Sequence, residues 1–175
     1  MAERGVRPAA AADVAEIARL QLETWRTAYA TILPAHILGG LTDVDVAAHW
    51  SAAVSDPPSA QHRVLVAVEQ QWTVGFAAFG PAQDEGLDPA ANGLITALLV
   101  EPRWGRRGHG SRLLAATVDL LRLDGLSTAV TWLVEQDRAS QAFFASAGWE
   151  RDGAGRALDA GGRVVNEVRL HAALS

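Results

Sequence analysis

The stretch from Val100 to Leu114 most constrains the fold, and it reads Val-Glu-Pro-Arg-Trp-Gly-Arg-Arg-Gly-His-Gly-Ser-Arg-Leu-Leu. Residues 94–100 are almost wholly apolar, as in a buried strand. Apolar residues after the turn recur at helical spacing, at Leu113, Leu114, Val118 and Leu121. Gly108 and Gly110 let a ligand approach the backbone, and the first N–H groups of a helix attract phosphate oxygens. This strand, basic turn and helix are typical of a pyrophosphate site.

Two better-known phosphate turns do not fit this segment. A nucleoside-triphosphate P-loop needs a lysine, and the chain contains none. A dinucleotide-binding turn has the spacing G-x-G-x-x-G, whereas Gly105, Gly108 and Gly110 give G-x-x-G-x-G. A flexible solvent turn is the remaining alternative, and the neighbouring arginines argue against it.

The segment resembles the acyl-coenzyme A binding signature of the GNAT superfamily of N-acetyltransferases. That signature is a strand ending in valine, often a proline, then R/Q-x-x-G-x-G/A and a helix. The matching positions are Val100, Pro102, Gly108, Gly110, Leu113 and Leu114. Gly105 stands where the family has Arg or Gln, and Arg106 follows where many members have glycine. Further similarities at residues 24–34 and 130–149 extend the resemblance from Val6 to about Leu170.

The resemblance implies an α/β fold with a mixed, mostly antiparallel sheet of six to seven strands, flanked by about four helices. Strands four and five are expected to splay apart. The residue patterns predict helices over 13–28 and 43–54 and strands over 6–8, 64–68, 73–79, 94–100 and 130–134. A final hairpin is expected to turn at 159–162 into 163–171. The length of 175 residues fits one domain spanning 1–175.

Acetyl-CoA is the co-substrate that the resemblance implies. Main-chain groups of Leu98, Leu99 and Val100 are expected to pair with pantetheine and the thioester carbonyl. The pyrophosphate is expected on the turn residues Arg106, Arg107, Gly108, His109, Gly110 and Ser111. Asp137, Ser140 and Phe143, from the later strand and helix of the pattern, complete the expected cofactor site.

The catalytic groups usual in the family are missing from their positions. Leu94 stands where many relatives carry a glutamate base, and Phe144 stands where a tyrosine commonly protonates the leaving thiolate. Phe144 has no proton to donate. Glu135 and Tyr29 are the remaining candidates for proton transfer, although Glu135 also fits a simple strand-end residue. Histidine is the residue type most often used for proton transfer near neutral pH, but His109 belongs to the pyrophosphate turn.

Trp25 and Tyr29 share one helix face and are the expected acceptor-binding residues, with core packing as the alternative.

Two functions remain open. The first is an N-acetyltransferase that moves the acetyl group directly to a primary amine of a small molecule or peptide. The second is an acyl-CoA-binding module that has lost its catalytic groups.

The composition of the chain excludes several kinds of site and partner. The chain has no cysteine, so disulfides, thiolate metal sites and a cysteine acyl-enzyme are excluded. Its five histidines lack paired spacing, and no metal is expected. A net charge of −5 argues against nucleic acid as the main partner, and no apolar run reaches the length of a membrane span. A cytoplasmic protein is expected, and the oligomeric state is open between a monomer and a homodimer.

Overall fold

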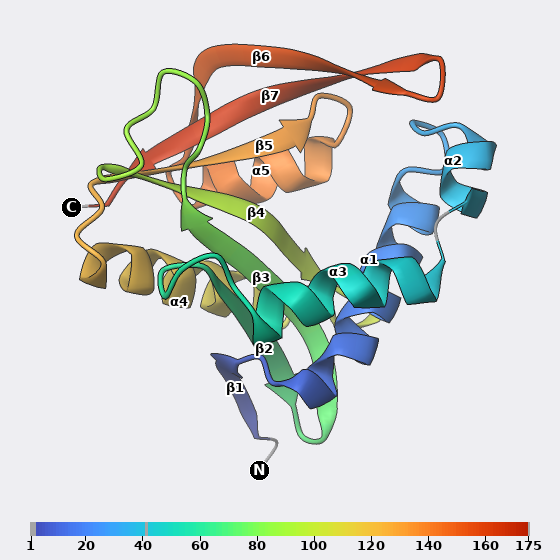
Figure 1. Ribbon diagram of the computed structural model, residues 1–175, viewed down its shortest axis with the longest axis horizontal. Helices are drawn as coiled ribbons and strands as arrows, with labels where there is room; N and C mark the ends of the chain where they lie inside the picture. Colours follow the sequence, from blue (N-terminus) through green and yellow to red (C-terminus); the bar gives the residue numbers. More distant parts are fainter. Residues whose placement is uncertain (1–2, 41, 175) are drawn as a thin grey trace.

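A single seven-stranded sheet organises the chain in a computed structural model that describes residues 3–40 and 42–174 (Figure 1). The strand order is β1-β2-β3-β4-β5-β7-β6. The strands are β1 (Arg4–Pro8), β2 (Arg63–Glu69), β3 (Trp72–Pro81), β4 (Asn92–Val100), β5 (Thr128–Val134), β6 (Glu150–Ala160) and β7 (Arg163–Ala173). The helices are α1 (Val14–Ala28), α2 (Ala35–Gly40), α3 (Asp43–Ser55), α4 (His109–Leu123) and α5 (Arg138–Ser146). Short 3-10 turns lie at Ala11–Asp13 and Pro102–Trp104.

The expected α/β class and the mostly antiparallel sheet are confirmed. All strand pairs are antiparallel except β4 with β5, which run parallel. The structure has one α-helix more than the four expected, because the short α2 carries too few residues to show a helical period.

Helices cover both faces of the sheet, so its central strands are buried on each side (Figure 1). Helices α1 and α3 pack on one face, where Ile17, Leu20 and Trp50 meet Phe76. Helices α4 and α5 pack on the other, where Leu113, Leu121 and Phe144 meet strand residues such as Ala77. Burial on both faces explains why β2, β3 and β4 read as continuous apolar runs.

The splay expected between strands four and five is confirmed. Only Asn92–Ile95 of β4 pairs with β5, at Thr128–Thr131, and the two strands separate beyond that point. The separation begins at a β-bulge, because Ala97 and Ile95 pair with consecutive residues of β3 and leave Thr96 as the extra residue. The β5-facing main-chain groups after Ile95 are therefore available to a ligand.

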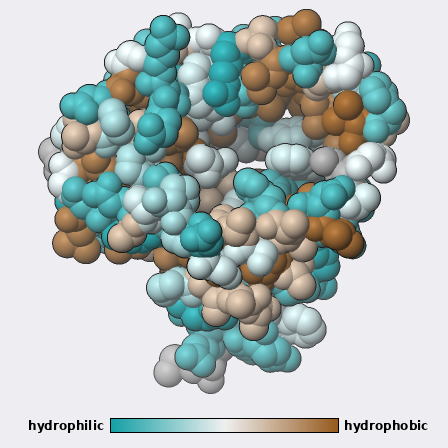
Figure 2. Space-filling model, in the orientation of Figure 1, coloured by the Kyte–Doolittle hydropathy of each residue, from teal (hydrophilic) through white to brown (hydrophobic). Residues whose placement is uncertain are grey.

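The hairpin of β6 and β7 reaches across to the loop between α1 and α2 (Figure 1). Nη1 of Arg163 donates hydrogen bonds to the carbonyls of Thr31 and Ile32 at 3.3 and 3.2 Å. The turn at Gly161 also packs against His36 and Ile37. The tip of the hairpin thus closes a ring with α2, and an opening is visible below it in Figure 2.

A 3-10 turn precedes α1, and the Asp13 side chain does not cap that helix. The Asp13 carboxylate accepts from the Ala10 N–H at 2.7 Å, and Arg7 donates to both its oxygens. Glu16 pairs with Arg19. Asp13 therefore stands at the N-cap of α1 without capping it through its side chain, because its carboxylate bonds back to Ala10 across the 3-10 turn.

No helix among residues 3–40 and 42–174 is long and apolar enough to cross a membrane.

Candidate active site

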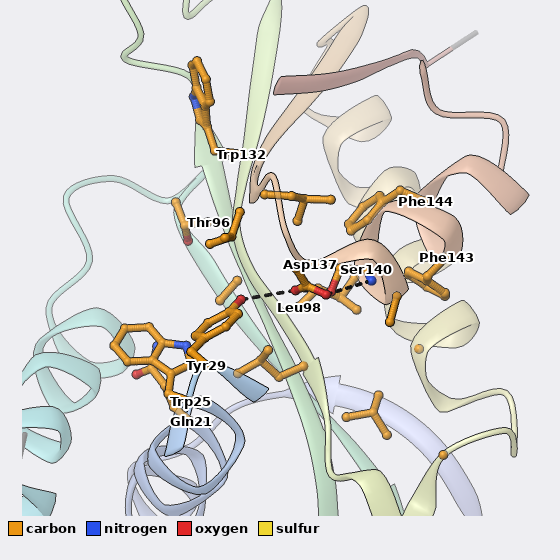
Figure 3. A pocket seen from close by; sticks show the side chains of 18 of the residues that line it. Gln21, Trp25, Tyr29, Thr96, Leu98, Trp132, Asp137, Ser140, Phe143 and Phe144 are labelled. Atoms are coloured by element: carbon orange, nitrogen blue, oxygen red, sulfur yellow. Dashed lines mark hydrogen bonds between the residues drawn. The ribbon is translucent and has the colours of Figure 1, made fainter. Parts of the chain in front are cut away.

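A cavity of about 790 Å³ occupies the gap between the splayed strands (Figure 3). Its walls come from α1, β4, the turn before α4, β5, α5 and the β6–β7 hairpin. It contains the expected residues Trp25, Tyr29, Leu98, Leu99, Val100, Arg106, Gly108, His109, Gly110, Ser111, Asp137, Ser140 and Phe143. The fold therefore gathers most of the residues that were singled out in the sequence, although they come from distant segments.

The basic turn presents its backbone to one end of this cavity. Gly108 caps α4 with φ +82°, a left-handed conformation that favours glycine. Because Arg112 donates the first main-chain bond of the helix, to the Gly108 carbonyl, the N–H groups of His109, Gly110 and Ser111 lack helical partners. Such a terminus binds an anionic group such as pyrophosphate.

Arg106 is the turn arginine that lines the cavity. Its φ of +62° is unusual for a residue with a side chain, and such conformations concentrate at functional sites. Its guanidinium forms no hydrogen bond or ion pair with the part of the chain that the structure describes. Arg106 is thus available to an anionic ligand, as expected from its place beside Gly105.

The side chains of Arg107 and His109 differ from the expectation that they bind the cofactor. Arg107 donates to Glu69 at 3.0 Å and does not line the cavity. The imidazole of His109 is buried, with Nε2 at 2.7 Å from Glu69 and Nδ1 at 2.9 Å from Arg112. Arginine only donates, so Nδ1 accepts and the Nε2–H of a neutral imidazole donates to Glu69.

Glu69 is the centre of this support beneath the turn. The hydrogen bond from His109 lowers the pKa of the Glu69 carboxyl, and Arg4 and Arg107 lower it further against the opposing effect of burial. Arg112 also donates to the carbonyl of Arg107 at 3.2 Å. The network holds the turn from below and leaves its N–H groups directed at the cavity.

Asp137 lies between the two walls of the cavity (Figure 3). As the residue before α5 it accepts from the N–H of Ser140 at 3.1 Å and from its hydroxyl at 2.7 Å. The Tyr29 hydroxyl, from the C-cap residue of α1 on the opposite wall, donates to the same carboxylate at 3.3 Å. Burial raises the pKa of the Tyr29 phenol, and the neighbouring carboxylates of Asp137 and Glu167 raise it further. Tyr29 therefore keeps its proton at neutral pH.

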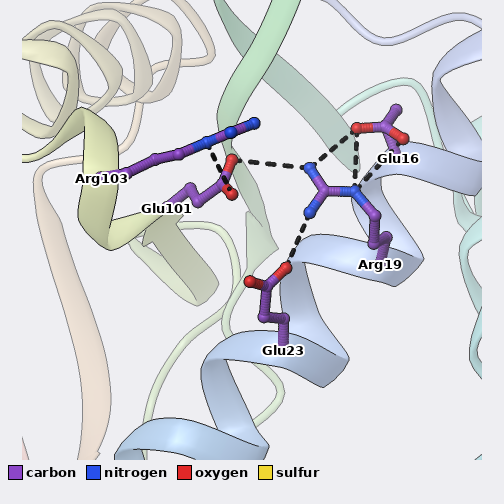
Figure 4. Close-up of polar contacts among 5 residues, drawn as sticks. All are labelled: Glu16, Arg19, Glu23, Glu101 and Arg103. Carbon is purple, nitrogen blue, oxygen red and sulfur yellow. Dashed lines mark hydrogen bonds and ion pairs between the residues drawn. The ribbon is translucent and has the colours of Figure 1, made fainter.

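Helix α1 is held in place next to the cavity by ion pairs (Figure 4). Arg19 pairs with Glu16 and Glu23 on its own helix and reaches Glu101, just after β4, at 3.5 Å. Arg103 pairs with Glu101 from the other side at 3.0 Å. The contact fixes the helix that carries Trp25 and Tyr29 against the end of β4.

Phe144 and Leu94, which replace the usual proton-transfer residues, are packed into the fold. Phe144 is buried and meets Phe143 and Trp149 edge-on, with ring centroids 5.3 and 5.1 Å away. Leu94 pairs with Val130 in the ordered part of the parallel ladder. Neither side chain offers a proton to a ligand.

Glu135 is not brought into this cavity. It is exposed and lines a second, smaller cavity together with Asn166 and Arg163. Its main-chain N–H donates to the Asn166 carbonyl at 2.8 Å, as a strand-end residue does. This placement agrees with the interpretation of Glu135 as a simple strand-end residue.

Several cavity residues were not singled out in the sequence. They include Gln21, Leu33, Thr96, Trp132, Leu158, Ala160, Val165 and Glu167. Thr96 and Trp132 flank the point where β4 and β5 separate, and the apolar residues from 158 to 165 come from the closing hairpin. The positions of the hairpin residues in the chain do not show that these residues face a ligand, because that depends on the register of β6 and β7.

Residues 17–149 match the family model described as the acetyltransferase (GNAT) family. The chain is 33% identical over 135 residues to the uncharacterized N-acetyltransferase YuaI of Bacillus subtilis (strain 168), covering 75% of this chain and 72% of that protein.

Solved structures share the fold. An N-acetyltransferase from Staphylococcus aureus Mu50 aligns with a TM-score of 0.76, 15% identity and 99% of both chains covered. The paia N-acetyltransferase from Thermoplasma acidophilum, solved in complex with coenzyme A, aligns with a TM-score of 0.75 and 14% identity, covering 94% of this chain and 98% of that one. The family match and the relative in Bacillus subtilis together show that the chain belongs to the GNAT family of acetyltransferases.

Proposed function

We propose that the protein is an N-acetyltransferase that moves the acetyl group of acetyl-CoA directly to a primary amine. One cavity brings together an unpaired helix terminus, the free arginine Arg106 and the polar pair of Tyr29 and Asp137. This combination is the observation that carries the proposal. The N–H groups of residues 109–111 and Arg106 suit the pyrophosphate. The main-chain groups of the segment Leu98 to Val100 that face β5 lack a strand partner, although the segment pairs with β3 on its other side, and they suit the pantetheine arm and the thioester carbonyl.

Further support comes from the relatives. The Thermoplasma acidophilum structure of the same fold is described with coenzyme A, and the Bacillus subtilis relative is named an N-acetyltransferase. The residues present here fit such a co-substrate, because the turn has both the hydrogen-bond donors and the positive charge that a pyrophosphate requires. Ser140 and Phe143, at the start of α5, would line the pantetheine arm.

Tyr29 and Asp137 are the proposed proton-transfer groups. The nitrogen of the neutral amine attacks the thioester carbonyl, a C–N bond forms and the C–S bond breaks. The Tyr29 hydroxyl donates to the departing sulfur, while the proton lost by the nitrogen passes to the Asp137 carboxylate. The hydrogen bond between Tyr29 and Asp137 lets that proton return to the phenol oxygen, so the products are the amide and the free thiol of CoA. Positioning both reactants in one cavity supplies a large part of the acceleration.

The alternative is an acyl-CoA-binding module without catalysis. The observation that favours it is that apolar Phe144, which is buried, and Leu94, which pairs with β5, stand where the usual groups are expected. Tyr29 and Asp137 favour the enzyme, since they bring an O–H donor and a carboxylate into the cavity. Proton transfer contributes about 10² to 10⁴ of an enzyme's rate, so even an imperfect replacement leaves measurable turnover.

Release of free CoA thiol in the presence of an amine panel tests the proposal. Release is expected only when protein, acetyl-CoA and an amine are all present, with the acetylated amine detected by mass spectrometry. Tight acetyl-CoA binding by calorimetry without thiol release for any amine would overturn the enzyme and leave the binding module. The panel contains alkyl, aryl, amino-acid and peptide amines, so that no acceptor class is omitted.

A further inference from the structure

The acceptor end of the cavity has apolar and aromatic walls. Away from the turn and β4, it is lined by Gln21, Trp25, Tyr29, Leu33, Trp132, Leu158, Ala160 and Val165. Trp25 and Tyr29 lie one helical turn apart on α1, with ring centroids 6.5 Å apart (Figure 3). Such walls stabilise an apolar or aromatic tail by burial of its surface.

The charges that line the described cavity are unequally distributed along it. Arg106 lies at the pyrophosphate end, whereas Asp137 and Glu167 lie at the thioester and acceptor end. Asp137 accepts hydrogen bonds from Ser140 and Tyr29 but forms no ion pair with any arginine in residues 3–40 and 42–174. The chain has no lysine. Asp137 therefore offers the acceptor end a negative charge that no arginine of the described residues balances, whereas Glu167 is paired with Arg156.

The nearby arginines are occupied outside the cavity. Arg156 pairs with Glu167 at 2.6 Å, and its guanidinium lies 4.3 Å from the centroid of the Trp132 ring. Arg169 pairs with Asp152 and lies 5.4 Å from the same ring. Neither arginine lines the cavity, so neither provides a partner for an anionic substituent on the acceptor.

The rings of Trp25 and Tyr29 are left for a substrate cation. In the described residues the arginine–ring contacts involve Trp104 and Trp132. A primary amine enters solution at neutral pH as an ammonium ion, and an ammonium is stabilised both by a carboxylate and by the face of an aromatic ring. Asp137, beside Tyr29, supplies the carboxylate, and Trp25 supplies the aromatic face.

The closed ring of hairpin and α2 restricts the size of the acceptor. Arg163 and Gly161 fasten the hairpin tip to the α1–α2 region over the cavity. A small molecule requires no detachment of the tip, so it is favoured over a lysine on a folded protein surface.

We infer that the acceptor is a small lipophilic primary amine, an aryl or alkyl amine without a carboxylate or phosphate group. The inference rests on the proposed acetyltransferase function and specifies its substrate class. A carboxylate on the carbon next to the amine would be placed near Asp137 with no cation to balance it. Repulsion between two neighbouring carboxylates in a partly buried site reduces the affinity for the acceptor by about 100-fold.

Three amines of one skeleton test the inference: phenethylamine, phenylalaninamide and phenylalanine. The expected kcat/KM is highest for phenethylamine, lower for the uncharged amide and about 100-fold lower for phenylalanine than for phenethylamine. Tryptamine and tryptophan repeat the comparison with a larger ring. A higher kcat/KM for the amino acids than for their decarboxylated counterparts would overturn the substrate class and leave the acetyltransferase intact. Absence of turnover with every amine would overturn both.

A variant of Asp137 identifies the cause of the discrimination. Asp137→Asn keeps a side chain that caps α5 but removes its negative charge. The ratio of kcat/KM for phenethylamine to that for phenylalanine is expected to fall about tenfold, mainly through KM. Asp119→Asn, an exposed carboxylate on α4 outside the cavity, is the matched control and should keep the wild-type ratio. An unchanged ratio in Asp137→Asn would overturn the role of its charge.

Discussion

The conformation of Gly108 gives the sharpest prediction for the pyrophosphate turn. Gly108→Val places a β-branched residue at φ +82°, and its Cβ would lie 3.0 Å from a guanidinium nitrogen of Arg112. A side chain in this region costs about 1 to 3 kcal/mol. If the turn moves to relieve the strain, binding must restore the native turn at that cost. At 1.4 kcal/mol for each factor of ten, the Kd of CoA rises about 5- to 140-fold.

Gly86 is a matched control, since it has φ +83° with open space around its Cβ position and lies in the loop before β4, outside both cavities. Gly86→Val carries the same backbone strain and should lose about 1 to 3 kcal/mol of unfolding free energy in urea denaturation while binding CoA normally. Isothermal titration calorimetry measures the Kd of both variants. A wild-type Kd for Gly108→Val would refute the assigned turn.

Three further changes test other parts of the site. Tyr29→Phe removes the hydroxyl that we propose as the proton donor to the sulfur, so kcat should fall about 100-fold with little change in the Kd of CoA, and full activity would exclude Tyr29. Glu69→Gln weakens the charge-assisted bond from His109 beneath the turn, so the Kd of CoA from calorimetry should rise about fivefold; an unchanged value would contradict the supporting role. The bonds from Arg7 lower the pKa of Asp13, so the stability that this carboxylate contributes is present above its ordinary pKa of about 4 and is lost as pH falls through the lowered value. Asp13→Asn should therefore lose about 1 kcal/mol at pH 7 and show a flatter decline below pH 4 in urea titrations, whereas a wild-type decline would assign the acid sensitivity elsewhere.

Local patterns were sufficient to predict most of the fold. The apolar run before the turn and the helical spacing after it correspond to β4 and α4, and the turn at Gly161 lies where the glycine pair predicted a hairpin. These features depend on residues that are close in the chain. The bulge at Thr96, which sets the start of the splay, has no comparable signal because it is defined by pairing with β3.

The site was predicted less completely, because its polar contacts join distant segments. Tyr29 and Asp137 are 108 positions apart, and their hydrogen bond depends on how α1 packs next to β4. The imidazole of His109 has its partner on β2, so its place in the turn suggested a cofactor contact that its burial prevents. Glu167 faces the cavity only through the pairing of β7 with β5 and β6.

Transfer of a labelled acetyl group is the most direct test of the account. The protein is mixed with acetyl-CoA that carries the label in its acetyl group, with and without phenethylamine, and the label is followed into the amide and into the protein. The account predicts labelled amide only when the amine is present, with no acetylated protein intermediate at any time. Label that accumulates on the protein before the amide forms, or no labelled amide with any acceptor of the panel, would contradict direct transfer in this cavity.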